Sequence, residues 1–235
     1  MATYVQTNVG LYWGGYSLAS SFNAIALNLG NSPQDDTVYG DTTVSSAAGL
    51  SSVQLEAEGF WESATDSVLQ SSLGSDDTVL SVTPVDQAAG SPSLFSKVTA
   101  STYNPISTGT VGNMLGFSLS AEGRGEKSVS GEILVIPATY TSSSETATNA
   151  SIGAVSATQS VYSALHVTAA SGTLDVIVES APSNWSSEST RITHTRFTAV
   201  GAEMLSTAGA ITDAYWRVKW TLSGSFDFIV SLGII

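Results

Sequence analysis

Apolar and polar residues alternate along much of this chain, with the period of two that is typical of β-strands. The clearest run is Val53–Phe60. Its odd-numbered positions are apolar or small, and its even-numbered positions before Phe60 are Gln54, Glu56 and Glu58. This pattern predicts a strand with one face in a core and one acidic face in water.

A second run, Gly112–Glu122, repeats the pattern, with apolar residues on one face and two serines and Glu122 on the other. Two strands that each have an apolar and a polar face can share one sheet. We therefore expect Glu56, Glu58 and Glu122 to lie on the wet side of the same sheet.

Only Ser63–Leu73 has apolar residues at helical spacing. Ser63 is a plausible N-cap and Gly74 a plausible stop, so the segment predicts one short helix. The remaining predicted strands are Phe22–Leu29, Thr78–Thr83, Leu94–Tyr103, Ser130–Pro137, Ser160–Ala169, Gly172–Ser180, Thr193–Ala199, Tyr215–Leu222 and Ser225–Ile234. The predicted fold class is mainly β, and the regular spacing of the last strands indicates a C-terminal β-sandwich.

Between the predicted strands Phe22–Leu29 and Val53–Phe60, the segment Asn31–Leu50 has little periodicity and contains Asp35, Asp36 and Asp41. Loops longer than ~12–15 residues in a compact domain usually serve a function. We interpret this segment as a long loop that contacts another subunit.

A Ser/Thr-rich stretch without apolar periodicity, Thr139–Ser151, predicts a linker. We place a first domain at residues 1–140, the linker at 141–151 and the β-sandwich domain at 152–235. Net charge changes at the same place: the chain carries 13 acids and 3 bases up to Tyr140, and 7 acids and 4 bases after it.

The total formal charge of −13 disfavours direct nucleic-acid binding, because no basic patch is present to release counterions. The absence of cysteine excludes disulfides and thiolate chemistry. No stretch approaches the roughly 20 apolar residues of a membrane span. The first residues also lack a signal-peptide pattern.

Catalytic and metal-binding patterns are not found. The only histidines are His166 and His194, no nucleophile-elbow motif is present, and we expect His166 on a sheet surface. The acids do not follow metal-loop spacing. We predict no enzyme activity, no catalytic residue, no metal and no cofactor. A hydrolase that uses the acidic strand remains an alternative, because its glutamates could approach Glu122.

The order of segments in residues 20–137 resembles the tail tube proteins of long-tailed, non-contractile bacteriophages. The resemblance rests on FNAIALNL, PQDDTVYGDTTVSSAAGL, SVQLEAEGF, SATDSVLQSSLG, LFSKVTASTYNPISTGTVGNMLGFSLSAEGRG and SGEILV. It covers roughly half of the chain. The later run YWRVKWTLSGSFDFIVSLGI is similar to accessory β-sandwich domains of phage virion proteins.

This resemblance implies a tail-tube-type β-sandwich or barrel fold and a structural role. Such subunits form stacked rings, here a hexamer, whose lumen lets DNA pass without specific binding. It implies that Glu56, Glu58 and Glu122 face the lumen, and that the loop with its aspartates bridges rings. It further implies tape-measure, tail-terminator and distal-tail partners, no membrane, and a place in the virion tail after synthesis in the host bacterial cytoplasm.

Two alternatives come from another functional class. The aromatic strand Tyr215–Leu222 in a Ser/Thr-rich sandwich is compatible with a carbohydrate-binding or adhesion module, although such aromatic residues more often lie in a core. A capsid decoration protein would share the β-rich composition and the dependence on neighbouring copies.

Overall fold

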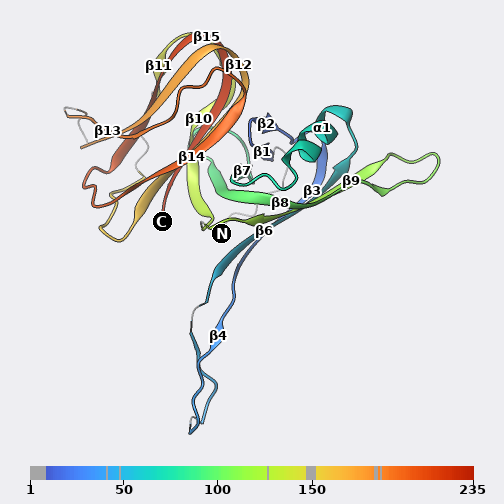
Figure 1. The fold of residues 1–235 in the computed structure, drawn as a ribbon. Coiled ribbons are helices and arrows are strands. Elements are labelled where there is room, and N and C mark those ends of the chain that lie inside the picture. The colour runs from blue at the N-terminus through green and yellow to red at the C-terminus, as the bar shows by residue number, and fades with distance from the viewer. Residues whose placement is uncertain are drawn as a thin grey trace. The chain divides into compact units, whose positions relative to one another are not determined.

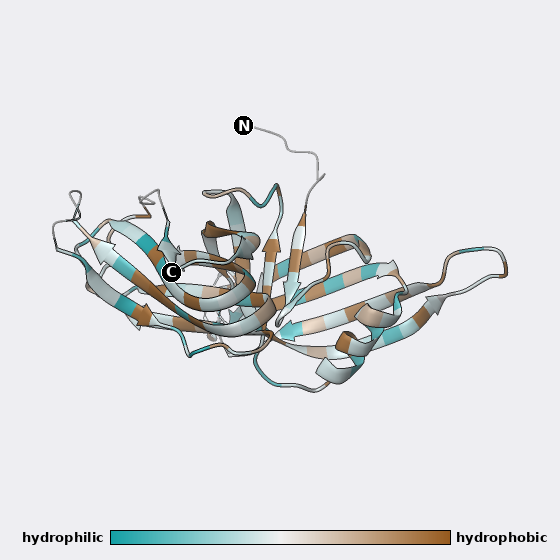
Figure 2. Cartoon of the chain, turned by 90° about the horizontal axis from the view of Figure 1, so that it is seen from above, coloured by the Kyte–Doolittle hydropathy of each residue, from teal (hydrophilic) through white to brown (hydrophobic). Residues whose placement is uncertain are grey.

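The computed structural model describes residues 9–40, 42–47, 49–125, 127–146, 152–182, 185 and 187–235. The chain is mainly β, and the described residues contain a single helix, which confirms the predicted fold class. It divides into two compact units: unit 1 comprises Met1–Ser20, Thr78–Ser96 and Val129–Ile235, and unit 2 comprises Ser21–Asp77 and Lys97–Ser128. Figure 1 shows the strands and the helix, and Figure 2 shows polar and apolar residues alternating along the strands.

Unit 2 is built on four antiparallel strands in the order β3-β6-β9-β8. Their bounds are β3 (Phe22–Asn31), β6 (Ser51–Phe60), β8 (Pro92–Thr108) and β9 (Gly116–Gly123), with β8 entering this unit at Lys97. Burial alternates strictly along β6 from Val53 to Phe60. The predicted two-faced sheet is therefore present.

Helix α1 (Ser63–Ser72) packs on the apolar face of this sheet and spans nearly the predicted residues. The side chain of Leu69, a residue of this helix, is fully buried, and its burial contributes ~1.5–3 kcal/mol of hydrophobic stabilisation. The hydroxyl of Tyr103 donates a 2.7 Å hydrogen bond to Asp66 of the helix. The predicted cap at Ser63 is wrong: the N-cap residue is Glu62, and its side chain makes no capping hydrogen bond.

The segment predicted as a loop is instead a two-stranded ribbon, which we call the arm (residues 32–50). It continues the β3–β6 pair through β4 (Gln34–Asp35) and β5 (Ser46–Ala47) and projects from the sheet (Figure 1). Its described residues are almost all exposed. Because both faces of the ribbon meet water, the sequence shows no alternation there.

Unit 1 is organised by two long strands, β12 (Ser160–Ala181) and β15 (Tyr215–Ile234), which pair along nearly their whole length. Each was predicted as two separate strands. The predicted breaks correspond to Gly172 and Gly224, which lie directly opposite each other with φ of 108° and 94°. The two strands curve over together (Figure 1) and stay paired on both sides of the glycines, so the predicted breaks are positions with a local change of backbone direction inside one continuous ribbon.

The other strands of unit 1 attach to this ribbon or to its neighbours. The path runs β13-β12-β15-β10-β8-β7-β1-β2, with β14 also on β12 and β11 on β15. Their bounds are β1 (Gly10–Trp13), β2 (Tyr16–Ser17), β7 (Thr78–Thr83), β10 (Val129–Tyr140), β11 (Ser144–Glu145), β13 (Ser189–Thr193) and β14 (Gly201–Ala208).

The main core of unit 1 takes side chains from both halves of β12 and β15, so the bent ribbon encloses it. Trp216 and Trp220 are buried in this core, and their Nε1 atoms donate hydrogen bonds of 2.9 and 3.1 Å to the carbonyls of Gly153 and Ser142. The two Trp side chains on which the adhesion alternative relies are therefore core residues, and they offer no platform for a sugar.

The two units differ from the predicted domains 1–140 and 152–235. Strand β10 pairs with β15 up to the pair Tyr140–Phe226, so residues 129–140 join the C-terminal strands. Within the predicted linker, β11 pairs with β15, and residues 147–151 lie outside the described part of the chain. Local composition cannot reveal a pairing partner that lies about eighty residues further on.

Candidate functional site

The acidic face of the unit 2 sheet is the strongest candidate surface. It presents Glu56 and Glu58 from β6 and Glu122 from β9, and all three side chains are exposed. The register places Glu122 opposite Gln54, in the row next to Glu56. The structure thus brings the three predicted glutamates onto one face.

Cross-strand pairing extends this face over all four strands in three rows. The rows are Asn28–Gln54–Glu122–Thr99, Ala26–Glu56–Ser120–Thr102 and Ala24–Glu58–Ser118–Asn104. These rows contain three carboxylates, small or amide side chains, and no base. These rows have no cationic group that can form an ion pair with phosphate, and their negative charge repels a polyanion.

The arm carries the other predicted site residues. Asp35 and Asp36 are exposed on it, and Asp41 lies outside the described residues. Hydrogen bonds from the side chain and the backbone N–H of Thr37 lower the pKa of Asp35. Both described aspartates belong to a ribbon held by backbone pairing between Gln34–Asp35 and Ser46–Ala47.

His166 does not lie on a sheet surface as we expected, because it is almost completely buried in unit 1. Its Nδ1 donates a 2.6 Å hydrogen bond to the carbonyl of Gly14, so Nε2 accepts the 2.7 Å bond from the Ser81 hydroxyl. Burial lowers its pKa from 6.5 to about 4. His166 is therefore a neutral structural residue.

We predict that unit 1 loses stability on acidification because of His166. Between pH 6.5 and about 4, His166 is protonated in the unfolded chain but stays neutral in the folded chain. The free energy of unfolding therefore decreases as the pH falls through this range. The shift corresponds to ~3 kcal/mol across this window. Urea unfolding followed at several pH values should show this slope in the wild type. A His166→Gln variant, although less stable at pH 7, should show a smaller slope; an unchanged slope would contradict the prediction.

The structure contains a buried hydrogen-bond chain that the sequence did not indicate, formed by Ser163, His194 and Glu203. The Ser163 hydroxyl lies 3.0 Å from His194 Nε2, and His194 Nδ1 lies 3.0 Å from a Glu203 oxygen. The same oxygen accepts the N–H of Thr195 at 2.9 Å. A serine nucleophile must be reachable by a substrate, but Ser163 is 0% exposed and His194 only 3%. This hydrogen-bond chain satisfies buried polar groups, and we assign it a packing role.

Within the described ranges, no group of three or more His, Asp or Glu side chains is placed to hold a metal ion. The described residues also contain no helix long and apolar enough to cross a membrane. The absence of enzyme activity stays a prediction.

The sequence matches no protein-family model and no curated protein. Among solved structures, it is similar to a chain from the virion of a native gene transfer agent particle, with 12% identity and a TM-score of 0.37 over 45% of this chain and 82% of that one. It is also similar to a chain of the anti-feeding prophage baseplate, with 12% identity and a TM-score of 0.33 over 55% and 97%. A chain of the phage P2 baseplate in its activated conformation matches with 8% identity and a TM-score of 0.39 over 95% and 98%. The structural neighbours thus come from virion and baseplate assemblies.

Proposed function

We propose that this chain is a structural virion protein, the tube subunit of a siphophage-type tail. Copies form a ring, proposed to be a hexamer, and rings stack so that the acidic sheet faces line a continuous channel for DNA. The observation that carries the proposal is a four-stranded sheet with two different faces. Helix α1 lies on the apolar face, and the other face holds three rows of acidic, small and amide side chains in which the glutamates are exposed. Ejected DNA would meet a wall that repels phosphate along its path.

The free edge of the sheet supports assembly. Strand β3 pairs only with β6, and no described strand covers its other edge from Phe22 to Asn31. Proteins normally protect a long exposed edge, because it pairs readily with another chain. Pairing with the next copy around a ring would complete the sheet and close it into a barrel without edges.

The arm supports contact between rings. A two-stranded ribbon alone is at best marginally stable in water. This one exposes Val38, Val44 and Leu50 without a core of its own. A neighbouring copy would cover these side chains. The proposal includes tape-measure, tail-terminator and distal-tail partners and a place in the virion tail.

Negative-stain microscopy of the purified protein, or of the particle that contains it, tests the proposal. Stacked rings or regular tubes are the expected result. A protein that stays monomeric at high concentration and binds a glycan array would overturn it in favour of an adhesion module.

We expect the arm to be dispensable for folding and required for tube growth. Asn31 pairs directly with Ser51, so a two-residue Asn-Gly turn can replace residues 32–50 without disturbing the sheet. The circular dichroism spectrum and melting temperature of this variant should remain close to those of the wild type, while microscopy should show no tubes. Normal tubes from the armless variant would contradict the prediction.

A further inference from the structure

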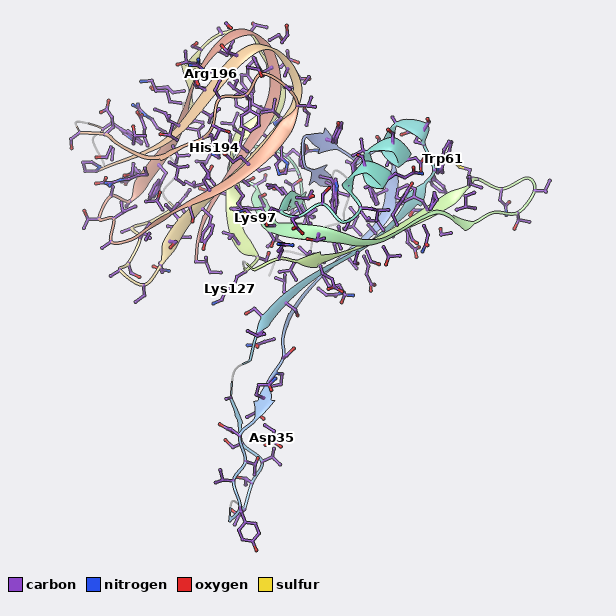
Figure 3. The ribbon with its side chains drawn as sticks, viewed as in Figure 1. Asp35, Trp61, Lys97, Lys127, His194 and Arg196 are labelled. Atoms are coloured by element: carbon purple, nitrogen blue, oxygen red, sulfur yellow. The ribbon has the colours of Figure 1, made fainter. Side chains whose placement is uncertain are left out.

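A groove opens at the end of the unit 2 sheet where the arm begins. It has a volume of about 340 Å³ and is lined by Leu50, Ser51, Val53, Gly123, Gly125 and Lys127. Among the described residues of the lining, Lys127 is the only charged one, and its side chain is exposed. Figure 3 labels Lys127 and, out on the arm, Asp35.

Two glycines keep the groove open. A Cβ atom on Gly123 would lie 2.7 Å from Cβ of Val53, which is closer than two carbon atoms can approach. Gly125 has a φ of 67°, a conformation that side chains disfavour, and it borders open space. The glycines leave backbone on the groove wall, so an extended segment can approach it closely.

Exposed apolar surface surrounds this groove. Leu50 is 85% exposed, and Leu29, which pairs with Val53, is 56% exposed. Covering a leucine side chain fully is worth ~1.5–3 kcal/mol. The groove and its margin therefore favour an occupant that brings apolar side chains together with negative charge.

The arm of a second copy has this chemistry. Residues 32–50 contain three aspartates and no lysine or arginine, and the exposed apolar residues Val38 and Val44 lie beyond Asp36. At ~3.3 Å per residue the ribbon reaches roughly 30 Å from its base. The arm projects from the sheet (Figure 1), and its described residues are almost all exposed, so its outer part is available to another molecule.

We infer that the groove at Lys127 binds the arm of a second copy, with Asp35 and Asp36 near the Lys127 ammonium and arm apolar residues against Leu50. The outer part of the arm, from Asp35 to Val44, and the groove at the base of the arm are different surfaces. The contact is therefore heterologous and repeats from copy to copy, as an open stack requires. The inference rests on the proposed function, for which it names the surface that receives the arm.

Cysteine cross-linking tests this contact cleanly, because the chain contains no cysteine. Mixing an Asp36→Cys variant with a Lys127→Cys variant under mild oxidation, or with a short bismaleimide, should give covalent dimers. A chain carrying both substitutions should give a ladder of oligomers on a non-reducing gel. The matched control replaces Lys127→Cys by Lys219→Cys, an exposed lysine of unit 1, and should give neither product.

Charge exchange provides the second measurement. Lys127→Glu and Asp36→Lys should each raise the concentration needed for assembly about fivefold, the effect of one exposed ion pair, and the double variant should recover. Lys219→Glu should change nothing. Tubes that give no specific cross-link and show no recovery would overturn this inference and leave the proposed function standing. Cross-linked ladders in samples without tubes would support the contact and overturn the tube.

Discussion

Replacing Glu56, Glu58 and Glu122 by lysine should turn a surface that repels DNA into one that holds it. The change takes the face from three negative to three positive charges without touching the core, because all three side chains are exposed. Exposed substitutions of this kind usually alter stability by less than ~0.5 kcal/mol. Any change in DNA behaviour can then be assigned to charge.

Binding to duplex DNA measured by fluorescence anisotropy checks this expectation. The wild-type subunit should show no measurable affinity. The lysine variant should bind and should lose about 40-fold in affinity between about 50 and 200 mM salt, the effect of about three neutralised phosphates. The control with glutamine at the same three positions removes the acids without adding bases, and it should not bind.

If the chain forms the proposed tube, the effect should be larger in assembled particles, because the charges of every ring would then act on one DNA molecule. Particles carrying the lysine variant should retain DNA after the trigger for ejection, and added salt should release it. If these particles ejected DNA at the wild-type rate, the electrostatic role of the acidic face would be wrong, even if tubes still formed.

The second large effect is expected at the bend of the long ribbon in unit 1. A Cβ atom on Gly224 would lie 1.8 Å from the carbonyl oxygen of Ser171, and the residue has a φ of 94°. A valine there must therefore displace the backbone of β12 and adopt a strained conformation. The combined cost is several kcal/mol, against a total stability of ~5–15 kcal/mol. We expect Gly224→Val to leave unit 1 unfolded.

Gly153→Ala is the matched control, because Gly153 lies in the same unit with a φ of 105° but has no atom within 4 Å of its Cβ position. It should cost only ~1–2 kcal/mol, from the strained backbone alone. Urea unfolding and near-ultraviolet circular dichroism would compare the two variants. If the Gly224→Val protein were as stable as the Gly153→Ala protein, the prediction would be wrong, and the backbone of β12 near Ser171 would have moved at little energetic cost.

The half-buried parts of the fold were predictable from the sequence. The sheet in unit 2 has a core on one side and water on the other, and this condition imposes the alternation seen from Val53 to Glu58. Helix α1 was found for the same reason, since its apolar stripe must face the sheet. The shared face of Glu56, Glu58 and Glu122 followed from these two patterns.

Features that depend on distant pairing were not predictable. Gly172 and Gly224 were interpreted as strand boundaries, because glycine commonly interrupts strands. The sequence does not show that these two glycines lie opposite each other inside one continuous ribbon. His166 sits in an alternating run, and only its contacts with Gly14 and Ser81, more than eighty residues away, show that it is buried. The groove at Lys127 forms where the start of β6 lies next to the turn that follows β9. No local sequence pattern indicates that these two segments lie together.

The interleaving of the two units along the chain gives them different histories during synthesis. Unit 2 is complete once Ser128 has left the ribosome, and its four strands pair only with one another there. Unit 1 begins earlier in the sequence, with strand β1, but it cannot be completed at that stage. Its strand β10 pairs with β15, which ends at Ile234 and is synthesised last. Because chains emerge at ~5–20 residues per second, the unit with the arm and the open β3 edge can fold seconds before the other. Nascent chains on one messenger would therefore expose early the two surfaces that we propose to self-associate, and slow elongation after Ser128 would lengthen that exposure.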